Sequence, residues 1–259
     1  MKNPAAWRPT KFVLRGGAWR SSRDGSEVGA GSRLITDAVA RVYGEQLPLH
    51  ARGRLLDLGC GKVPLYGAYR DLVSEVCCVD WAAGTHIDHE CDLSQPLPFG
   101  DAQFDTIVLS DVLEHVPDPA LLWREMARLL APGGRLIMNV PFFYWLHAHP
   151  HDYYRYTCFA LERFVRMNGL ALLAMRPLGG VAEVLADLLA KLLAKLPWVG
   201  APLALALQGL VGAFGRTGLG ARLAITSARH FPLAYFLVAE RAPGEKGKKG
   251  GPAVSADPA

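Results

Sequence analysis

Two apolar runs, one leading into a glycine turn and one ending at a carboxylate, constrain the fold of this chain most. Residues 55–62 read LLDLGCGK, and 23 residues after Asp57 the second run, CCVD, ends at Asp80. A Gly-x-Gly turn lets backbone approach a ligand closely, and an acid at the tip of the next strand can accept hydrogen bonds from two ribose hydroxyls. The chain is therefore expected to bind a nucleoside-containing cofactor. This pattern alone leaves a nicotinamide-dependent dehydrogenase open.

Helical patterns recur between the apolar runs. Apolar residues follow Ser32, a candidate N-cap, at helical spacing, and a short helix is expected across residues 65–72. Asp118, followed by a proline, predicts another helix start, and that helix is expected to end at the APGG sequence with Gly133 in the left-handed conformation. Thr157 is expected to cap the helix after that.

Strand patterns alternate with these helices, which predicts an α/β fold with a mainly parallel, doubly wound sheet. The interpretation divides the chain into an arm (1–30), one domain (31–240) and a disordered tail (241–259). The expected strands cover residues 54–59, 75–80, 106–109, 135–141, 170–175 and 232–240.

Four separated motifs occur in order: DLGCGK at 57–62, VDW at 79–81, CDLSQPLPFGDAQFDTIVLSDVLEHV at 91–116, and LLAPGGRLIMNVP at 129–141. This series resembles the class I S-adenosylmethionine-dependent methyltransferases, in particular the broad type 11 group, over roughly residues 53–141. The resemblance implies a Rossmann-like, seven-stranded sheet whose last strand is antiparallel. It also implies S-adenosylmethionine as the cofactor and methyl transfer as the reaction.

The resemblance further implies that the loops after the first four strands bind the cofactor. The glycine turn would line its methionine and ribose side, the second strand would end near the ribose and adenine, and the third near the adenine amino group. By position, these residues are Asp57, Gly59, Cys60 and Gly61 in the turn, then Asp80 and Trp81, then Asp92 and Leu93, and finally Ser110 near the methionine moiety. His115 in the next loop is a further catalytic candidate. For Ser110 and His115, the alternative is a role in ordering the loop.

One departure from the family pattern lies just after the glycine turn. Lys62, Val63 and Pro64 occupy the region where the family usually has a third glycine. Because proline biases its predecessor toward extended backbone, we expect the loop to be extended at Val63. A protein with the methyltransferase fold that binds cofactor or a partner without turnover is therefore kept as an alternative.

The segment PFFYWLHAHPHDYYRYT, residues 141–157, is the expected wall of the acceptor site, because it follows a strand whose carboxyl end faces the cofactor. Methyl transfer needs an oriented acceptor and, for a hydroxyl, removal of its proton. His151 is the favoured base, oriented by Asp152. The alternative is a network of His151, Asp152 and Arg155 that only fixes the loop. No metal is expected, although His147, His149 and His151 share one side of an extended segment.

A helical insertion is expected at about residues 179–229, before the last strand. Its leucines recur at helical spacing from Leu185 to Leu196, with Asp187, Lys191 and Lys195 on the opposite side. Residues 196–215 carry no charge, but prolines and glycines make a continuous membrane span poor. Four uses of residues 182–215 remain open: ordinary packing, a lid over the acceptor, homo-oligomer contact, or peripheral membrane contact.

Composition narrows the functional classes. A net charge of +4 in 259 residues does not suggest a nucleic-acid protein. Five cysteines without a C-x-x-C pair suit reduced thiols, and no continuous apolar stretch near the N-terminus resembles a secretory signal, so a cytoplasmic location is expected, with membrane association open. We expect O-methylation of a small or lipid-linked metabolite; the sequence does not name it.

Overall fold

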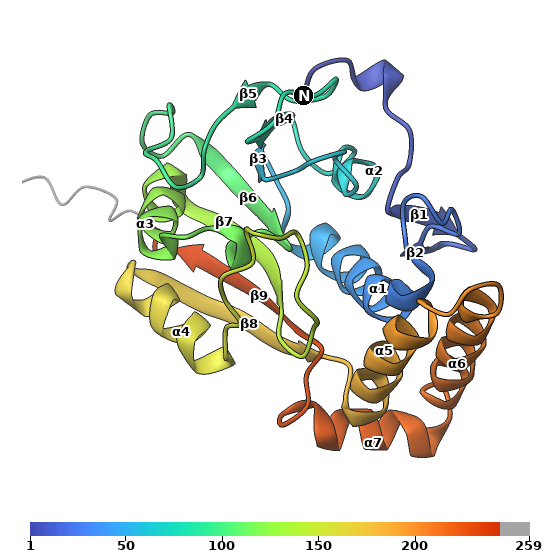
Figure 1. Cartoon of the computed structure of the whole chain (residues 1–259). Helices are drawn as coiled ribbons and strands as arrows, with labels where there is room; N and C mark the ends of the chain where they lie inside the picture. The colour runs from blue at the N-terminus through green and yellow to red at the C-terminus, as the bar shows by residue number, and fades with distance from the viewer. Residues whose placement is uncertain (244–259) are drawn as a thin grey trace, which may run out of the picture.

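The computed structural model describes residues 1–243, and the predicted disorder of the tail concerns residues that lie almost entirely outside this part. A seven-stranded sheet in the order β5-β4-β3-β6-β7-β9-β8 forms the centre of the molecule (Figure 1). Strand β9 runs antiparallel to both neighbours and the other pairs are parallel, as expected. The strands are β3 (Arg54–Leu58), β4 (Glu75–Asp80), β5 (His89–Glu90), β6 (Phe104–Ser110), β7 (Leu130–Pro141), β8 (Leu170–Leu178) and β9 (Ala234–Arg241).

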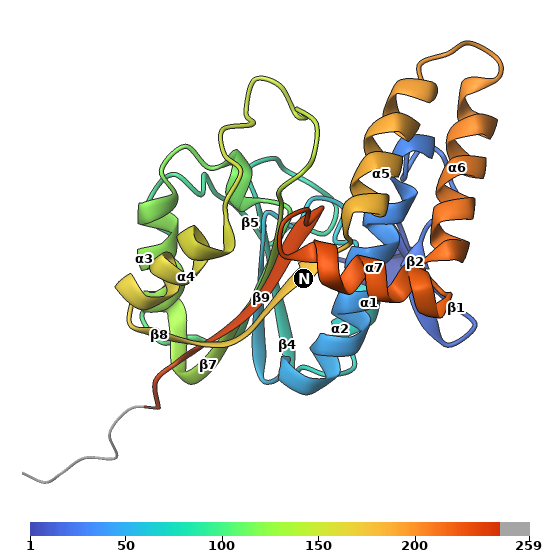
Figure 2. The same ribbon diagram turned by 90° about the horizontal axis from the view of Figure 1, so that it is seen from below.

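Helices cover both faces of this sheet, giving three layers (Figures 1 and 2). Helices α3 and α4 pack on one face through a core that includes Trp123 and Leu161, and α1 and α2 pack on the other through Tyr43 and Tyr69. The helices are α1 (Arg33–His50), α2 (Tyr66–Tyr69), α3 (Pro119–Leu129), α4 (Cys158–Met167), α5 (Val181–Leu193), α6 (Gly200–Phe214) and α7 (Gly218–Ala228), with short 3-10 turns η1 (Pro4–Ala6), η2 (Ala30–Ser32) and η3 (Leu113–His115).

The predicted caps are confirmed at two helices and differ in detail at two others. Asp118 accepts a hydrogen bond from the Leu121 backbone N–H (3.1 Å), and Thr157 accepts one from Ala160 (3.2 Å). Ser32 occupies the N-cap position of α1, but its side chain makes no capping hydrogen bond and lies 3.2 Å from the Tyr144 hydroxyl instead. Gly133 has the expected positive φ of 77°, but it lies within β7, since α3 already ends at Leu129.

The N-terminal arm is folded onto the domain, which sequence periodicity did not predict. It contains a hairpin of β1 (Phe12–Arg15) and β2 (Ala18–Ser21), joined by two glycines with φ of 59° and 74°. Positive φ at both turn positions suits the twist of a two-residue hairpin. The hairpin lies against α1, where Trp19 approaches Gly44 so closely that a Cβ there would be 2.8 Å from the indole.

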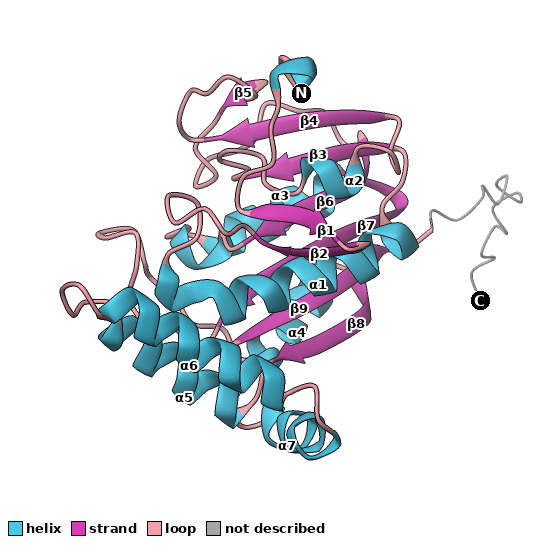
Figure 3. Ribbon diagram, turned by 90° about the vertical axis from the view of Figure 1, so that its right-hand side faces the viewer, coloured by secondary structure: helices cyan, strands magenta, loops and turns pink. Residues whose placement is uncertain are grey.

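The helical insertion between β8 and β9 consists of α5, α6 and α7, and α5 and α6 form a hairpin (Figure 3). The expected orientation of α5 is wrong. Asp187 and Lys191 are buried and form an ion pair with each other, and the Lys191 Nζ lies 4.1 Å from the centre of the Tyr144 ring. The leucine stripe faces outward instead, because the two opposite charges compensate each other in the interior. There the pair packs against η2 and the 142–156 loop. In the described chain no helix combines the length and hydropathy that a membrane span requires.

Candidate active site

A cavity of about 520 Å³ opens at the carboxyl ends of β3, β4 and β6. Parallel sheets place ligands at this edge, because the loops that leave neighbouring strands converge there. The cavity therefore brings together seven residues that the sequence pointed to, along with others that it did not. Its walls are Gly59, Asp80, Trp81, Asp92, Leu93, Ser94, Asp111, Val112, His115, Val116, Pro117, Ala148, His151 and Tyr153.

The glycine turn after β3 is pinned to β4 by its backbone. The N–H groups of Gly59 and Cys60 both donate to the Val79 carbonyl oxygen, at 2.8 and 3.1 Å. Gly59 has a φ of 66°, and a Cβ at this position would lie 2.6 Å from the Val112 side chain. Only glycine fits both the left-handed backbone and this close approach. The turn therefore has a fixed shape at the cavity wall.

The turn departs from expectation at Val63. Its φ is 51°, so the backbone is left-handed there rather than extended, although a proline follows. The side chain is fully buried, and its carbonyl oxygen accepts a hydrogen bond from Trp7 Nε1 (3.0 Å). Packing of the arm thus overrides the local bias of the Val-Pro step. Lys62 points elsewhere and pairs with Glu27 at 2.7 Å.

Asp80 and Asp92 bring carboxylates to one end of the cavity. Asp80 accepts hydrogen bonds from the backbone N–H groups of Gly61 (2.7 Å) and Ala82 (3.1 Å), one on each oxygen. Asp92 accepts one from Ser94 (2.8 Å). A carboxylate oxygen can accept a second hydrogen bond, so both acids keep acceptor capacity toward the cavity. Trp81 is 66% exposed, lines the same cavity and packs edge-on against the His151 ring.

Four of the predicted cofactor residues do not line this cavity. Asp57 is buried behind the turn, where it accepts a hydrogen bond from Tyr69 (2.7 Å), and burial raises the pKa of Asp57 to about 7. Ser110 donates to Asn139 Oδ1 (2.8 Å). Cys60 is buried, and Gly61 borders a neighbouring cavity that shares Asp80 with the first. Asp57, Cys60 and Ser110 therefore lie behind the cavity wall, whereas Gly61 faces the neighbouring cavity.

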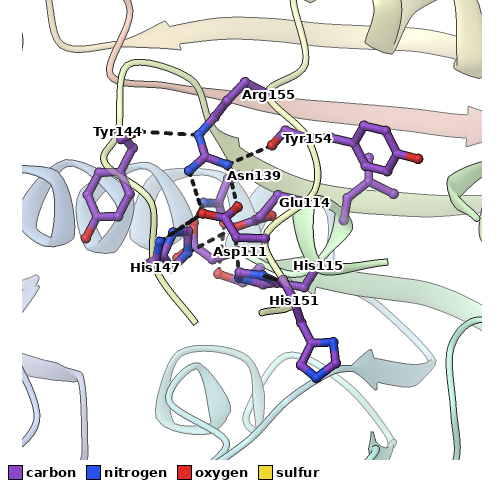
Figure 4. A network of polar contacts seen from close by, with 12 residues as sticks. Asp111, Glu114, His115, Asn139, Tyr144, His147, His151, Tyr154 and Arg155 are labelled. Atoms are coloured by element: carbon purple, nitrogen blue, oxygen red, sulfur yellow. Dashed lines mark hydrogen bonds and ion pairs between the residues drawn. The ribbon is translucent and has the colours of Figure 1, made fainter. Parts of the chain in front are cut away.

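The loop of residues 142–156 forms another wall through Ala148, His151 and Tyr153. A polar network that includes Arg155 and His147 holds this loop (Figure 4). Arg155 donates to both oxygens of Asp152, at 2.6 and 2.9 Å, and to the Trp145 carbonyl oxygen. The backbone N–H of His147 also donates to Asp152, at 2.9 Å. The Arg155 guanidinium holds the pKa of Asp152 well below its usual range.

The expectation that Asp152 orients His151 is therefore wrong. The Nδ1 atom of His151 lies 3.1 Å from the Tyr153 hydroxyl, and its ring lies edge-on to Trp81 with ring centres 5.2 Å apart. Asp152 instead faces His147 and Arg155. The loop-fixing alternative thus describes Asp152 and Arg155, while His151 itself reaches the cavity.

Sequence reasoning missed two acids in the phrase SDVLEHV. Asp111, with a φ of 53°, lines the cavity and pairs with Lys11 of the arm at 2.8 Å. Glu114 is fully buried, and burial raises its pKa well above the usual range. The motif placed both residues near the site, but no local signal indicated that an arm residue 100 positions away would close over Asp111.

A second cavity of about 360 Å³ lies on the other side of this phrase, toward α1 and the arm. Asp111 and His115 border both cavities, and His147, Glu114 and Lys11 border the second. Asp111 and His115 thus form part of the wall between the two cavities.

Comparison with known proteins identifies the family. The Methyltransferase domain family matches residues 30–174. A ubiquinone biosynthesis O-methyltransferase from Xanthomonas euvesicatoria is 33% identical over 106 residues, 34% of this chain and 43% of that protein. A demethylmenaquinone methyltransferase from Renibacterium salmoninarum is 30% identical over 115 residues, covering 41% and 45%. The matched region spans less than half the length of these curated relatives.

Solved structures share the fold over a larger part of the chain. A geranyl diphosphate methyltransferase in complex with S-adenosylmethionine superposes with a TM-score of 0.52 at 18% identity, over 85% of this chain and 93% of that one. The resemblance carried by the four motifs is thereby confirmed. This chain belongs to the methyltransferase domain family and has the Rossmann-like fold of class I S-adenosylmethionine-dependent methyltransferases.

Proposed function

We propose that this chain transfers the methyl group of S-adenosylmethionine to a hydroxyl oxygen of a small or lipid-linked metabolite. The observation that carries the proposal is the cavity at the carboxyl edge of the sheet. Two carboxylates, Asp80 at the end of β4 and Asp92 just after β5, lie at one side of it. His115 follows β6 at the other side, and His151 packs edge-on against Trp81. In this family such an edge holds the cofactor, and we assign the two imidazoles to the acceptor.

The residues at the carboxylate end fit the nucleoside half of the cofactor. Asp80 would accept the ribose hydroxyls, Asp92 with the Leu93 backbone would meet the adenine amino group, and Trp81 would flank the adenine ring. Gly59 lines the cavity and would contact the methionine half, because a glycine lets backbone approach a ligand closely. We assign Asp57, Cys60, Gly61 and Ser110 to supporting the shape of this wall.

When bound, the cofactor supplies an electrophilic methyl group for in-line displacement. The protein's contribution is to align the acceptor oxygen and to take its proton. We assign the proton acceptor role to His151, since its ring is at the cavity and its Nδ1 atom faces the Tyr153 hydroxyl, leaving Nε2 available. His115 is the second candidate. Asp152 acts by holding the loop, through Arg155.

The relatives' names support an apolar acceptor, and so does the surface of the helical insertion. Residues of α5–α7 leave large apolar side chains exposed beside the acceptor wall, and Lys195 lies 5.5 Å from the centre of the Trp145 ring in that wall. We propose that this surface contacts a membrane in its plane and receives the acceptor from it. The exposed residues include Leu185, Leu189, Leu192, Trp198, Leu210, Leu219 and Ile225, with Trp198 97% exposed.

The cofactor and the reaction can be tested separately. Thermal-shift titration should show stabilisation by S-adenosylhomocysteine and none by nicotinamide nucleotides, because only a ligand of the native state raises stability. Mass spectrometry of a lipid extract incubated with the enzyme and isotopically labelled S-adenosylmethionine should show one labelled methyl ether. Stabilisation without any labelled product would instead favour the binding protein without turnover.

The role of His151 predicts a specific pattern among variants. His151→Ala should slow turnover at least about a hundredfold and leave S-adenosylhomocysteine affinity nearly unchanged, since general-base catalysis contributes on that scale. The control is His230→Ala, at an exposed residue after α7 that lines neither cavity. Equal turnover by both variants would reject His151 as the base.

Membrane contact has its own test. The full chain should sediment with vesicles containing phosphatidylglycerol, and a variant with Leu192→Glu and Trp198→Glu should remain in the supernatant. These substitutions place charge on exposed positions, so folding should be preserved. Failure of the wild type to bind vesicles, together with a dimer by light scattering that the same variant dissociates, would assign the surface to self-association instead.

A further inference from the structure

We propose that Glu114, His115 and His147 form a binding site for one divalent transition-metal ion at the wall between the two cavities. The three side chains offer one carboxylate oxygen and two imidazole nitrogens, and these atoms all lie within 4.8 Å of one another. Two residues come from η3 after β6, and the third comes from the acceptor loop (Figure 4). The site therefore depends on the folded loop.

Glu114 provides the first argument. Its side chain is fully buried, yet neither carboxylate oxygen has a hydrogen-bond partner among the described residues. A buried carboxylate without a partner is costly, so it normally carries a proton or binds a cation. The Nε2 atoms of His115 and His147 lie 3.5 and 3.8 Å from its Oε1 atom. Ligand atoms about 2.1 Å from a tetrahedral zinc ion are separated by roughly 3.4 Å, so only small adjustments are needed.

The two histidines provide the second argument, because an oxygen atom lies close to the other ring nitrogen of each. The Nδ1 atom of His115 contacts the His151 carbonyl oxygen, which can only accept, so Nδ1 carries the proton. The Nδ1 atom of His147 lies 3.2 Å from Asp152 Oδ2, an ion-pair distance without hydrogen-bond geometry, and Arg155 holds that carboxylate. The Nε2 atoms of both rings lie on the Glu114 side, 3.5 and 3.8 Å from its Oε1 atom. Metal-binding histidines have this arrangement, with a carbonyl or carboxylate behind each ring.

The charges that surround this point favour a cation. Glu114, Asp111 and Asp152 are the nearby carboxylates, and Lys11 and Arg155 are the nearby cations, each paired with one of the latter two acids. Glu114 is left as the uncompensated group. Two imidazoles and one carboxylate suit zinc, cobalt or iron(II), whereas magnesium prefers oxygen ligands.

Three protein ligands leave an open coordination position at such an ion, as catalytic sites do. His115 borders both cavities, so this position would be accessible to an acceptor oxygen beside the methyl group. That role, holding the acceptor hydroxyl, rests on the proposed function. Metal binding itself does not, and it can be measured without any acceptor.

The test uses the full chain, stripped with chelator and dialysed. Titration with Zn²⁺ followed by calorimetry should give one ion per chain, and Co²⁺ should give the intense visible absorption of a four-coordinate site. Mg²⁺ in excess should not compete. Glu114→Gln and His147→Gln should each weaken Zn²⁺ binding at least tenfold, and Asp152→Asn should weaken it about ten- to a hundredfold through His147.

The matched control is His149→Gln, two residues from His147 on the same loop but exposed and outside the cluster. It should bind Zn²⁺ like the wild type. Circular dichroism and unfolding by urea without metal report whether each variant is folded. Absence of stoichiometric Zn²⁺ binding, or equal affinity in Glu114→Gln and His149→Gln, would overturn the site and leave a protonated Glu114 as the explanation. Labelled methyl transfer by metal-free protein would keep the proposed function and remove only the metal's role.

Discussion

Replacing Asp57 with asparagine should change how the stability of the metal-free, cofactor-free protein depends on pH. Asp57 is 3% exposed, and burial raises its pKa from 3.8 to about 7 despite the hydrogen bond from Tyr69. Between these values the folded chain holds a proton that the unfolded chain has lost. The free energy of unfolding therefore falls as pH rises, by about 4 kcal/mol in total for this one group.

Asparagine has the same shape, can still accept the Tyr69 hydrogen bond and does not titrate. Between about pH 5.5 and pH 8, the wild type should lose about 2 kcal/mol more stability than Asp57→Asn does. Urea unfolding at the two pH values measures this difference, because the other groups titrate alike in both proteins. Asp71→Asn, at a side chain that is 82% exposed, is the matched control and should show no such difference.

Tyr69→Phe provides a second check, in which the pH dependence should become steeper. Removing the donor removes a hydrogen bond that favours the charged form of Asp57. Relative to the wild type, this variant should therefore be destabilised more at about pH 8 than at pH 5.5. If Asp57→Asn and the wild type respond to pH identically, Asp57 titrates normally in the folded protein and the argument from burial fails.

Three further predictions concern the cavity wall and the core. Gly59→Ala should weaken S-adenosylhomocysteine binding at least tenfold, since its Cβ would lie 2.6 Å from Val112; unchanged affinity in calorimetry would show that the turn adapts. Trp123→Ala should lower the free energy of unfolding by about 3–5 kcal/mol, because the fully buried indole stacks on Phe164, and a loss below 1 kcal/mol would contradict its place in the core. Asp118→Ala should cost about 1 kcal/mol at the start of α3, and an unchanged urea midpoint would refute the cap.

Much of the fold could be predicted because its signals are local. Alternating apolar runs, the Asp118-Pro119 helix start and the Thr157 cap depend on neighbours within a few residues. The hairpin of the arm escaped prediction because its strands are short and its stability comes from packing on α1. A long-range contact, from Trp7 to Val63, likewise overrode a correct local rule about the residue before proline.

The candidate site also contains residues that the sequence could place and residues that it could not. Positions at strand ends, such as Asp80 and Asp92, could be placed from the order of motifs, since parallel strands bring their carboxyl ends to one edge. For Asp152 the sequence offered Arg155 as one of two alternatives and did not indicate His147, because the loop has several donors at similar separations and only its folded path selects among them. The outward direction of the α5 leucines could not be predicted either, because it depends on the burial of the Asp187–Lys191 ion pair.

From the sequence alone, the two apolar runs, the acids that end strands and the later SDVLEHV and PGG phrases determined the family, the sheet and the cofactor edge. Each of these is set by residue type and spacing along the chain. Tertiary structure decided what no spacing encodes: Lys11 against Asp111, His147 beside Glu114, and Val63 bent under the arm. Those pairings join residues far apart in sequence, and their free energy exists only once packing has excluded water and brought them together.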